Sequence, residues 1–388
     1  MNSPTKNFLY LITAVLFLQL MSCSKKDSVV TTNPYDTTKG NSPIPKSPGM
    51  ISYPADNPQT DAKIDLGRHL FYDKSLSPDG TTSCASCHKL SSGFADIFPT
   101  SLGVNGERGP RNAPSLVNIA YNASFNWDGR FASLEHQALC PIYNFQQLGN
   151  NFGTQIDSSS QWTTYNSQPG NFDSLFLYHR MNQRPSGLQG ESYPDMFIKV
   201  WGTATITMDH IAKSLAAFER TIISTNSDFD KYNNGDATVL SKNPEAIHGY
   251  QIFIDAKGAN CIGCHNGYNF TDGQFHDNGI GFNSKIIDHG RINVTKDQAD
   301  LVKFKTPTLR NVALTAPYMH DGRFATLEQV IKNYNKGGTH TTPNQDPRIK
   351  SLNMSDQDVS DLAEFLKTLT DHTFVADTSG NFSNPWGN

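Results

Sequence analysis

One pentapeptide pattern, Cys-x-x-Cys-His, constrains this 388-residue chain more than any other feature of its sequence. It occurs twice, as Cys84-Ala85-Ser86-Cys87-His88 and as Cys261-Ile262-Gly263-Cys264-His265. The pattern is the signature of c-type haem attachment, in which both thiols bond to the haem and the histidine becomes the proximal ligand of the iron. A zinc site would need a fourth ligand at each motif, and a redox disulfide of the thioredoxin kind would need a βαβ context that is not visible. We therefore predict two covalently bound c-type haems.

A longer repeat indicates that the two motifs belong to related halves of the chain. Residues 114–135 align without gaps on residues 307–328, and 12 of the 22 aligned positions are identical. In each half the Cys-x-x-Cys-His motif precedes this block, as expected for a tandem duplication. Apolar residues at helical spacing follow both blocks, at Ile211, Leu215, Phe218 and Ile222, and, after a Ser355-x-x-Asp358 cap, at Val359, Leu362, Leu366 and Leu369. No convincing strand alternation accompanies them, so the sequence predicts an all-α fold.

The predicted architecture is two tandem cytochrome c-type haem domains. We expect the N-terminal domain at residues 55–230, the C-terminal domain at 231–375 and a tail at 376–388. A segment of about 152–188, rich in Ser, Asn and Gln, looks like an insertion that forms a surface loop. The net charge of −4, without a long block of one sign, argues against a nucleic-acid partner.

The N-terminal segment resembles an export signal. Its apolar run from Phe8 to Leu20 has the length of a signal-peptide core and is too short to span a bilayer. The run leads into Leu-Met-Ser-Cys23, which resembles a bacterial lipobox with a lipidated cysteine, and a conventional signal with an incidental Cys23 is the alternative. Residues 24–54 have the composition of a flexible tether. We therefore predict a signal peptide at 1–22, a linker at 23–54, and a lipid anchor that holds the exported protein to the membrane on the periplasmic side of the envelope.

These assignments account for five of the six cysteines and leave no pair for a disulfide. Four cysteines hold haems and Cys23 carries the anchor, so Cys140 remains. We interpret Cys140 as a small buried hydrophobe, with a reactive thiol beside the first haem as the alternative.

The duplication also allows the two irons to be compared. Extending the alignment places Tyr334 of the second half on Pro141 of the first. A tyrosine can ligate haem iron through its phenolate oxygen, whereas proline offers no donor atom. If this position faces the iron, the second haem is closed by His265 and Tyr334 while the first is open above His88. An ordinary packed aromatic is the alternative for Tyr334, and the rival ligands are Met319 and Met354.

These features together resemble the bacterial di-haem cytochrome c peroxidase family, including its MauG branch. The resemblance extends from about Asp61 to Leu369, through LGRHLFYDKSLSPDGTTSCASCH, RGPRNAPSL, WDGR, residues 208–236 and TPTLRNVALTAPYMHDGR. It implies an enzyme that reduces hydrogen peroxide to water at the N-terminal haem, with electrons passed through the C-terminal haem from a small cytochrome c or a cupredoxin. The MauG branch implies oxidation of a specific protein substrate instead. A non-catalytic two-haem electron carrier is the rival interpretation, and a homodimer is implied by analogy alone.

The resemblance also implies roles for individual residues. It assigns His88 and His265 as proximal iron ligands and places Trp127 of WDGR between the haems as an electron relay, with a core indole as the alternative. The residues that match the family's calcium site between the domains are Asn112, Thr315 and Pro317. Oxygen ligands suit calcium, although these residues could also cap turns. The residues that match the lining of the distal pocket are Gln137 and Pro141.

Three positions depart from the pattern of many family peroxidases. Val104 stands where those enzymes carry a distal histidine, so activation by displacement of a histidine ligand should not be needed. Tyr334 stands where they place a methionine on the second haem, as in the MauG branch. Gln147 occupies the place of a distal glutamate.

The glutamine matters because an amide cannot accept a proton. Reduction of peroxide requires a proton to move between its two oxygens, and a positioned acid-base group contributes ~10²–10⁴-fold to such a step. We expect water, Glu107 or His136 to take this role, or else a low peroxidase rate. Glu107 belongs to the same loop as Val104, whereas a surface imidazole on a helix is the simpler interpretation of His136.

Overall fold

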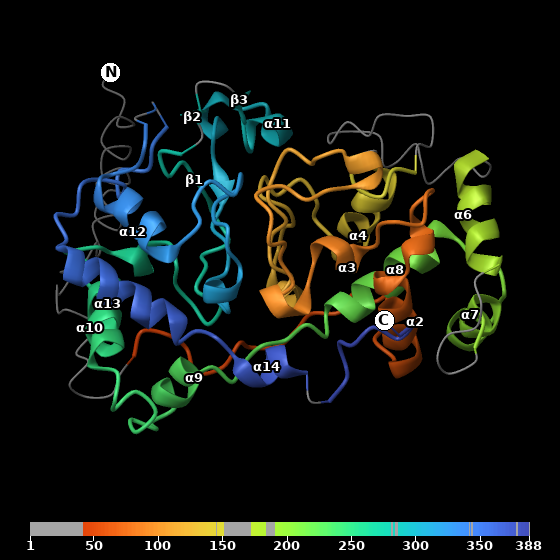
Figure 1. The fold of residues 1–388 in the computed structure, drawn as a ribbon, viewed down its shortest axis with the longest axis horizontal. Coiled ribbons are helices and arrows are strands. Elements are labelled where there is room, and N and C mark those ends of the chain that lie inside the picture. Colours follow the sequence, from red (N-terminus) through yellow and green to blue (C-terminus); the bar gives the residue numbers. More distant parts are fainter. Residues whose placement is uncertain are drawn as a thin grey trace, which may run out of the picture. The chain divides into compact units, whose positions relative to one another are not determined.

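The structure is a computed structural model that describes residues 42–144, 146–150, 172–183, 191–280, 282–283, 286–340, 342, 344–377 and 379–387. The predicted signal peptide, Cys23 and the first part of the predicted linker lie outside these residues. No helix in the described ranges is both long and apolar enough to cross a membrane. The residues from Ser42 onward form two lobes, each with one Cys-x-x-Cys-His motif (Figure 1).

The N-terminal lobe is built on two crossing helices, each of which begins at a threonine cap. Helix α2 (Asp61–Tyr72) packs against α8 (Met208–Glu219), and α4 (Leu134–Tyr143) packs on α8. The other helices of this lobe are α3 (Cys84–Cys87), α6 (Phe172–Gln183) and α7 (Tyr193–Trp201). Its 3₁₀ turns are η2 (Lys74–Leu76), η3 (Leu90–Ser92), η4 (Val104–Gly106) and η5 (Ile119–Tyr121).

The C-terminal lobe repeats this plan. Helix α10 (Pro244–Ile254) packs against α13 (Asp356–Lys367), and α12 (Leu327–Asn335) packs on α13. Helix α13 begins at the predicted Ser355 and Asp358 capping box, which confirms that helix start. Other described elements of this lobe are α9 (Asp228–Asn233), α11 (Ile292–Thr295), η6 (Cys261–Gly263), η7 (Gln298–Asp300) and η8 (Val312–Leu314). Helix α14 (His372–Ala376) follows α13 in the chain, and its Phe374 packs in the core of the N-terminal lobe.

A glycine brings the two helices of each crossing into contact. A Cβ atom on Gly67 of α2 would lie 1.9 Å from the Ser214 carbonyl oxygen of α8. A Cβ atom on Gly249 of α10 would lie 2.0 Å from the Asp361 carbonyl oxygen of α13. No side chain fits at either position, so the duplicated helices share the same close approach.

The prediction of an all-α fold needs one correction, because the described residues include four very short strands. β1 (Phe275–His276) pairs antiparallel with β4 (Phe304–Lys305), and β2 (Phe282–Asn283) pairs antiparallel with β3 (Ile286–Ile287). Each ladder spans two residues per strand, which is too short to produce the alternation that reveals a strand in a sequence. The fold is therefore helix-rich with little sheet.

Ordered structure also occurs where the sequence indicated a loop, a linker and a tail. Part of the expected insertion loop is helix α6, whose Leu177 is fully buried in the N-terminal lobe. Ile44, in the expected linker, is buried, and its carbonyl accepts from Asn233 Nδ2 of the C-terminal lobe. In the expected tail, the Trp386 indole N–H donates to His69 O in the N-terminal lobe. These contacts depend on single apolar residues within polar stretches, and such residues produce no periodic pattern.

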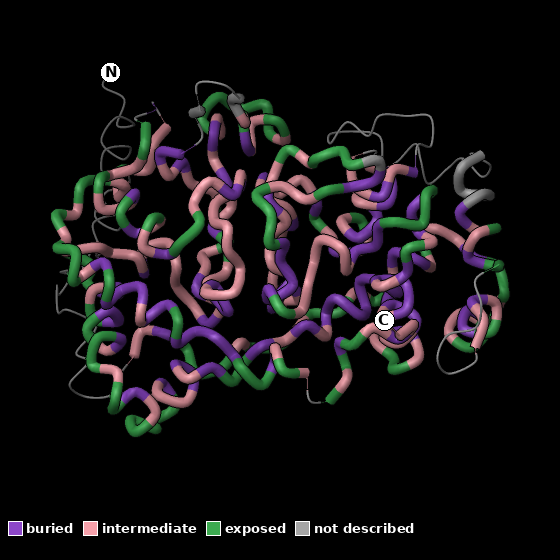
Figure 2. Tube along the Cα trace, viewed as in Figure 1, coloured by how far each residue is buried: buried purple, intermediate pink, exposed green. Residues whose placement is uncertain are grey.

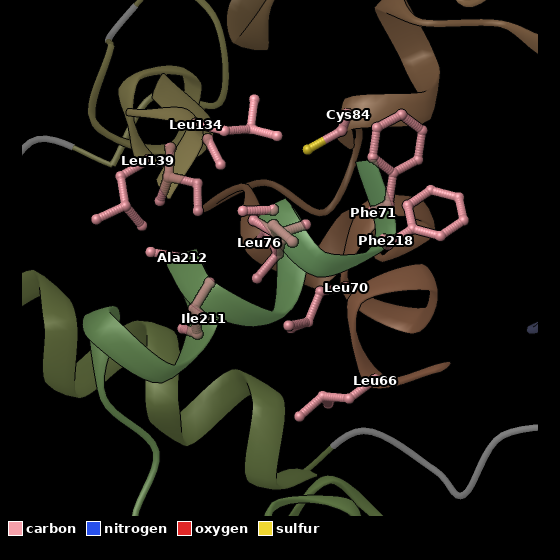
Figure 3. Packing of buried hydrophobic residues seen from close by; sticks show 14 of the residues in the cluster. Leu66, Leu70, Phe71, Leu76, Cys84, Leu134, Leu139, Ile211, Ala212 and Phe218 are labelled. Atoms are coloured by element: carbon pink, nitrogen blue, oxygen red, sulfur yellow. The ribbon is translucent and has the colours of Figure 1, made fainter. Parts of the chain in front are cut away.

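The core of the N-terminal lobe surrounds its first motif cysteine. Buried residues, purple in Figure 2, lie inside both lobes. In the N-terminal lobe they include Leu70, Phe71, Leu134 and Phe218, and Figure 3 shows the Cys84 sulfur among these side chains. Helices far apart in the sequence therefore enclose the attachment site.

Two backbone hydrogen bonds join the lobes, and they involve the same pair of duplicated positions in each lobe. The backbone N–H of Asn112 donates to His320 O at 2.7 Å, and that of Lys305 donates to Trp127 O at 2.8 Å. In the extended alignment Asn112 corresponds to Lys305, and Trp127 corresponds to His320. Each half thus contributes the same two positions to the junction.

An ion pair strengthens this junction from the N-terminal side. Arg111 donates to both carboxylate oxygens of Asp288, at 2.6 and 2.7 Å, and also to Asp128 at 2.7 Å. A bidentate arginine–carboxylate contact fixes orientation as well as distance. The two lobes are therefore held in one register at the point where the repeated blocks face each other.

Candidate functional site

The two predicted proximal histidines are held in the same way. His88 Nδ1 donates to Phe94 O at 2.8 Å, and His265 Nδ1 donates to Phe270 O at 3.0 Å. A carbonyl can only accept, so the proton resides on Nδ1 and the lone pair of Nε2 is left for a metal. Burial lowers the pKa of both imidazoles and keeps them neutral, which is the form that ligates iron. Both histidines fit proximal ligation.

The motif thiols are available for covalent attachment. The five cysteines within the described ranges are all free thiols. Burial raises the pKa of Cys84, Cys261 and Cys264, so these side chains stay protonated. Protonated thiols beside a neutral, fixed imidazole are the donor set of a c-type haem.

A cavity of about 880 Å³ extends from the second motif to the lobe junction. The residues predicted to attach, ligate or relay at the second haem line this cavity together: Cys261, Cys264, His265, Met319, Tyr334, Met354 and Trp127. A space of this size within the fold suits a large prosthetic group. The residues present therefore fit a haem in the C-terminal lobe.

Tyr334, on α12, enters this cavity with its hydroxyl held by an amide. Its Oη accepts from Asn278 Nδ2 at 3.2 Å, a contact for which the sequence offered no signal. Burial raises the pKa of the phenol to about 12, although the Asn278 hydrogen bond favours the phenolate. Met319 Sδ lies 3.8 Å from the same Nδ2. Two candidate iron ligands, Tyr334 and Met319, therefore both contact the Asn278 side chain. Ligation by Tyr334 stays a prediction.

In the N-terminal lobe, the loop with Val104 lies against the turn with Gln147. The Val104 N–H donates to Gln147 O at 2.9 Å, and a Cβ atom on Gly103 would lie 2.6 Å from the same oxygen. The side-chain Oε1 atoms of Gln137 and Gln147 are both buried, and neither has a hydrogen-bond partner in the part of the chain that is described. A buried acceptor without a partner is costly, so both atoms mark places for a water or a polar ligand.

The aligned positions on α4 and α12 differ in what they can offer a metal. Pro141 lies inside α4, where its carbonyl accepts from the Leu148 N–H at 3.0 Å. The proline ring has no ligating atom, whereas the aligned Tyr334 presents a hydroxyl to the cavity of the other lobe. One lobe therefore has a candidate sixth ligand at this position and the other does not.

The alternative acid-base residues lie on the surface. Glu107 follows η4 and is exposed, and His136 is exposed on α4. Neither side chain is buried together with the Oε1 atoms of Gln137 and Gln147. Cys140 is half-buried against the core of the N-terminal lobe, and burial raises the pKa of its thiol, which disfavours a reactive thiolate.

Trp127 lies at the lobe junction, where it lines the same cavity as the second motif. Its Nε1 donates to Asn112 O at 2.9 Å, so the indole is fixed from the N-terminal side. The Asn112 amide Nδ2 donates to Phe98 O at 3.1 Å. The residues predicted to bind calcium, Asn112, Thr315 and Pro317, all line this cavity. The structure thus brings them to one region, and calcium binding stays a prediction.

Sequence reasoning missed two charged features of the cavity wall. His276 lies between Asp272 and Asp346, and each ring nitrogen is 2.9 Å from a carboxylate oxygen. Lys305 lines the wall at the junction. No motif identifies the histidine cluster, but Lys305 could have been found as the residue aligned with Asn112.

Comparisons with known proteins agree with this geometry. Residues 61–238 match the family described as di-haem cytochrome c peroxidase, and residues 246–370 match cytochrome c. The cytochrome c551 peroxidase of Nitrosomonas europaea is 34% identical over 315 residues, which cover 81% of this chain and 81% of that protein. The methylamine utilization protein MauG of Methylophilus methylotrophus is 32% identical over 326 residues, which cover 84% of this chain and 87% of that protein.

Solved structures show the same two-lobed fold. A MauG-like protein associated with microbial copper homeostasis has a TM-score of 0.74 at 29% identity, over 88% of this chain and 98% of that chain. The diheme peroxidase BthA from Burkholderia thailandensis has a TM-score of 0.63 at 21% identity, over 82% of this chain and 88% of that chain. At that identity the second match supports the fold alone.

Proposed function

The chain belongs to the di-haem cytochrome c peroxidase family, and on this premise we propose that it reduces hydrogen peroxide to water in the N-terminal lobe. The observation that supports this site is the difference between two aligned positions. Tyr334 presents a ligating hydroxyl to the cavity of His265, whereas Pro141 has nothing to offer an iron held by His88. The substrate pocket therefore belongs to the N-terminal lobe.

The residues of this pocket are proposed to bind and orient peroxide. A haem held by His88 would supply a redox-active iron for the reduction of peroxide. Gln137 and Gln147 provide amide N–H donors for a peroxide oxygen, and their unpaired Oε1 atoms can accept its O–H. Neither amide can take up a proton, so a water molecule held by them carries the proton between the oxygens. Val104 leaves no competing ligand in the loop.

Electrons are proposed to enter at the C-terminal lobe and to cross the junction at Trp127. The indole lines the cavity of the second motif, and its backbone carbonyl is bonded to Lys305 of the C-terminal lobe. These contacts support a fixed position between the two sites. The donor is proposed to be a small cytochrome c or a cupredoxin.

A second candidate function is supported by two residues. Tyr334 and Val104 match the MauG branch, in which the reductant is a specific protein that becomes oxidised. A relative named MauG is 32% identical to this chain. Under this candidate the same pocket accepts peroxide, and a protein surface replaces the small redox donor.

We also propose a lipid anchor, a calcium ion and a homodimer. Cys23 is proposed to carry a lipid that holds the protein to the membrane on the periplasmic side of the envelope, which cell fractionation and intact mass measurement of a C23S variant would test. A calcium ion is proposed at Asn112, Thr315 and Pro317, and chelation should alter the haem spectra if it is present. A homodimer is proposed by analogy, and light scattering would test it.

Stopped-flow mixing of the ferric holoprotein with hydrogen peroxide tests the enzymatic proposal. A rapid change of the Soret band, followed by return when reduced small cytochrome c or cupredoxin is added, is the result expected for the peroxidase. A rapid change that no small donor reverses favours the MauG-like candidate. An unchanged Soret band would contradict both enzymatic candidates and favour the non-catalytic two-haem electron carrier.

A further inference from the structure

Lys305 is a cation at the lobe junction that the proposed reaction does not use. It ends strand β4 and lies two residues before Pro307, where the second repeated block begins. Its side chain reaches into the other lobe, where Nζ donates to the Ser124 carbonyl at 2.5 Å. The side chain therefore spans the junction.

This ammonium group lacks a carboxylate partner. Within the described ranges, no Asp or Glu oxygen lies at ion-pair distance from Nζ. Asp128 attracts it electrostatically, but its carboxylate already accepts from Arg111 at 2.7 Å and from Arg130 at 3.1 Å. An ammonium has three N–H donors, and Ser124 O satisfies one of them. Burial without a counter-ion accordingly lowers the pKa of Lys305 to about 8.

The unsatisfied donors belong to a group that faces the haem cavity. Lys305 lines the same cavity of about 880 Å³ as Cys264, His265 and Trp127. Arg348, another cation in this wall, already donates to the Asp346 carboxylate and to the Gly263 carbonyl. Lys305 can therefore form an ion pair with an anion in the cavity, whereas Arg348 is already paired with Asp346.

We propose that Lys305 binds a propionate carboxylate of the haem in the C-terminal lobe and positions that haem against the junction beside Trp127. The thioether bonds of a c-type haem use its vinyl groups, so both propionates remain free as carboxylates. An ammonium–carboxylate pair satisfies the unused N–H donors and compensates a charge that is otherwise buried alone. The inference rests on the proposed function only in requiring a haem at His265.

The pairing gives Lys305 two measurable effects. A positive charge next to a haem stabilises the reduced form relative to the oxidised form, so the lysine should raise the reduction potential of that haem. The contact also ties the edge of the haem to a side chain that is anchored on the other lobe. Lys305 is thus a positioning residue rather than a catalytic one.

Substitutions at Lys305 in the holoprotein test the assignment, with Lys303 as the matched control. Lys303 lies two residues earlier, and its Nζ is 3.5 Å from Asp300 within its own lobe. The measurements are the midpoint potentials of both haems by spectroelectrochemistry and the propionate bending modes by resonance Raman spectroscopy. We expect K305M to lower the potential of the His265 haem and to shift its propionate mode, whereas K305R and K303M leave both near the wild-type values.

The variants separate this inference from a structural role and from the proposed function. K305Q keeps an N–H donor for Ser124 O without the charge, so it should fold and incorporate two haems while showing the K305M shifts. Wild-type potentials and propionate modes in folded K305Q, or shifts confined to the His88 haem, would overturn the assignment. Peroxide reactivity is measured separately. A wild-type protein that does not react with peroxide contradicts the proposed function, but the reduction potentials still test the role of Lys305.

Discussion

The two lobes share a framework and differ where a haem iron would meet its sixth ligand. Both have a glycine at the helix crossing and a histidine anchored through Nδ1 to a backbone carbonyl. Both also have an asparagine with a left-handed backbone, Asn118 and Asn311, each at φ 57°. The N–H groups of these asparagines bond to Ile222 O and Leu369 O, just after the second crossing helix of their lobes. Duplication has preserved what holds the haem.

At the position of the sixth ligand, the lobes differ in a few side chains around α4 and α12. The C-terminal lobe combines Tyr334 with Asn278, while the N-terminal lobe has Pro141 and two buried glutamine oxygens to which no described residue donates a hydrogen bond. The same haem-attachment framework can therefore serve two different roles when the residues on the distal side of the haem differ.

Removal of the Tyr334 hydroxyl should have the largest effect. Y334F takes away the proposed sixth ligand, so the low-spin ferric signal of the C-terminal haem should be replaced by a high-spin signal or a new low-spin species in electron paramagnetic resonance. Tyr318 lines the same cavity, and Y318F is the matched control that should leave the signal unaltered. An unaltered low-spin signal in Y334F would assign ligation to Met319 or another group.

Introduction of a carboxylate into the N-terminal pocket should accelerate the peroxide reaction. Q147E supplies the acid-base group that the two amides lack, so the second-order rate constant from stopped flow should rise by about 10²-fold. Q146E places the same charge one residue away in the same turn and should change the rate little. A flat rate in Q147E would mean that Gln147 does not face the substrate.

The shared helix crossing can be tested in both lobes by adding one methyl group. G67A and G249A would each place a Cβ atom about 2 Å from a carbonyl oxygen, so each should lower the free energy of unfolding by about 1–3 kcal/mol. G109A is the control, since the nearest atom to its Cβ would be Arg111 O at 3.9 Å. Urea unfolding of the holoproteins measures the effect, and tolerance of alanine in one lobe alone would contradict a common framework.

The ion pair between the lobes should have the smallest effect and a defined pH dependence. Burial opposes ionisation of Asp288, but hydrogen bonds and charge from Arg111 outweigh it and lower the pKa below 3.8. The stabilisation is therefore fully present above pH 3.8 and is lost as the pH falls through the lowered pKa. D288N should cost about 1 kcal/mol of unfolding free energy at pH 7, and the gap to wild type should narrow on acidification.

The control for this pair is D300N. Asp300 makes only longer contacts, at 3.5 Å to Lys303 and 3.7 Å to Arg291 within the same lobe. Its substitution should change the unfolding free energy less than D288N does. Equal losses in the two variants would show that the junction is not held through Arg111.

Much of the site was predictable because its signals are local or repeated. The Cys-x-x-Cys-His motifs are contiguous, so the thiols and histidines could be located without a fold. The comparison of Tyr334 with Pro141 required the duplication, which supplies an internal alignment. The structure adds that the Val104 loop contacts the Gln147 turn.

The features that could not be predicted depend on tertiary contacts that produce no pattern in the sequence. Asn278 and Lys305 acquire their roles from partners far along the chain, and neither residue type is diagnostic by itself. Helix α6 lies in a stretch whose polar composition indicated a loop, and its buried Leu177 and Met181 are too few to show a helical pattern in the sequence. Glu107 belonged to the expected loop, but its exposure could not be read from its place in the sequence.

The difference between the two haem environments is the central claim, and the resting ferric holoprotein tests it most directly. Electron paramagnetic resonance should show one high-spin haem, assigned to the N-terminal lobe with Pro141, and one low-spin haem, assigned to the C-terminal lobe with Tyr334. Two low-spin signals of equal intensity in the wild-type protein would mean that both irons are closed, and would contradict the proposed peroxide site.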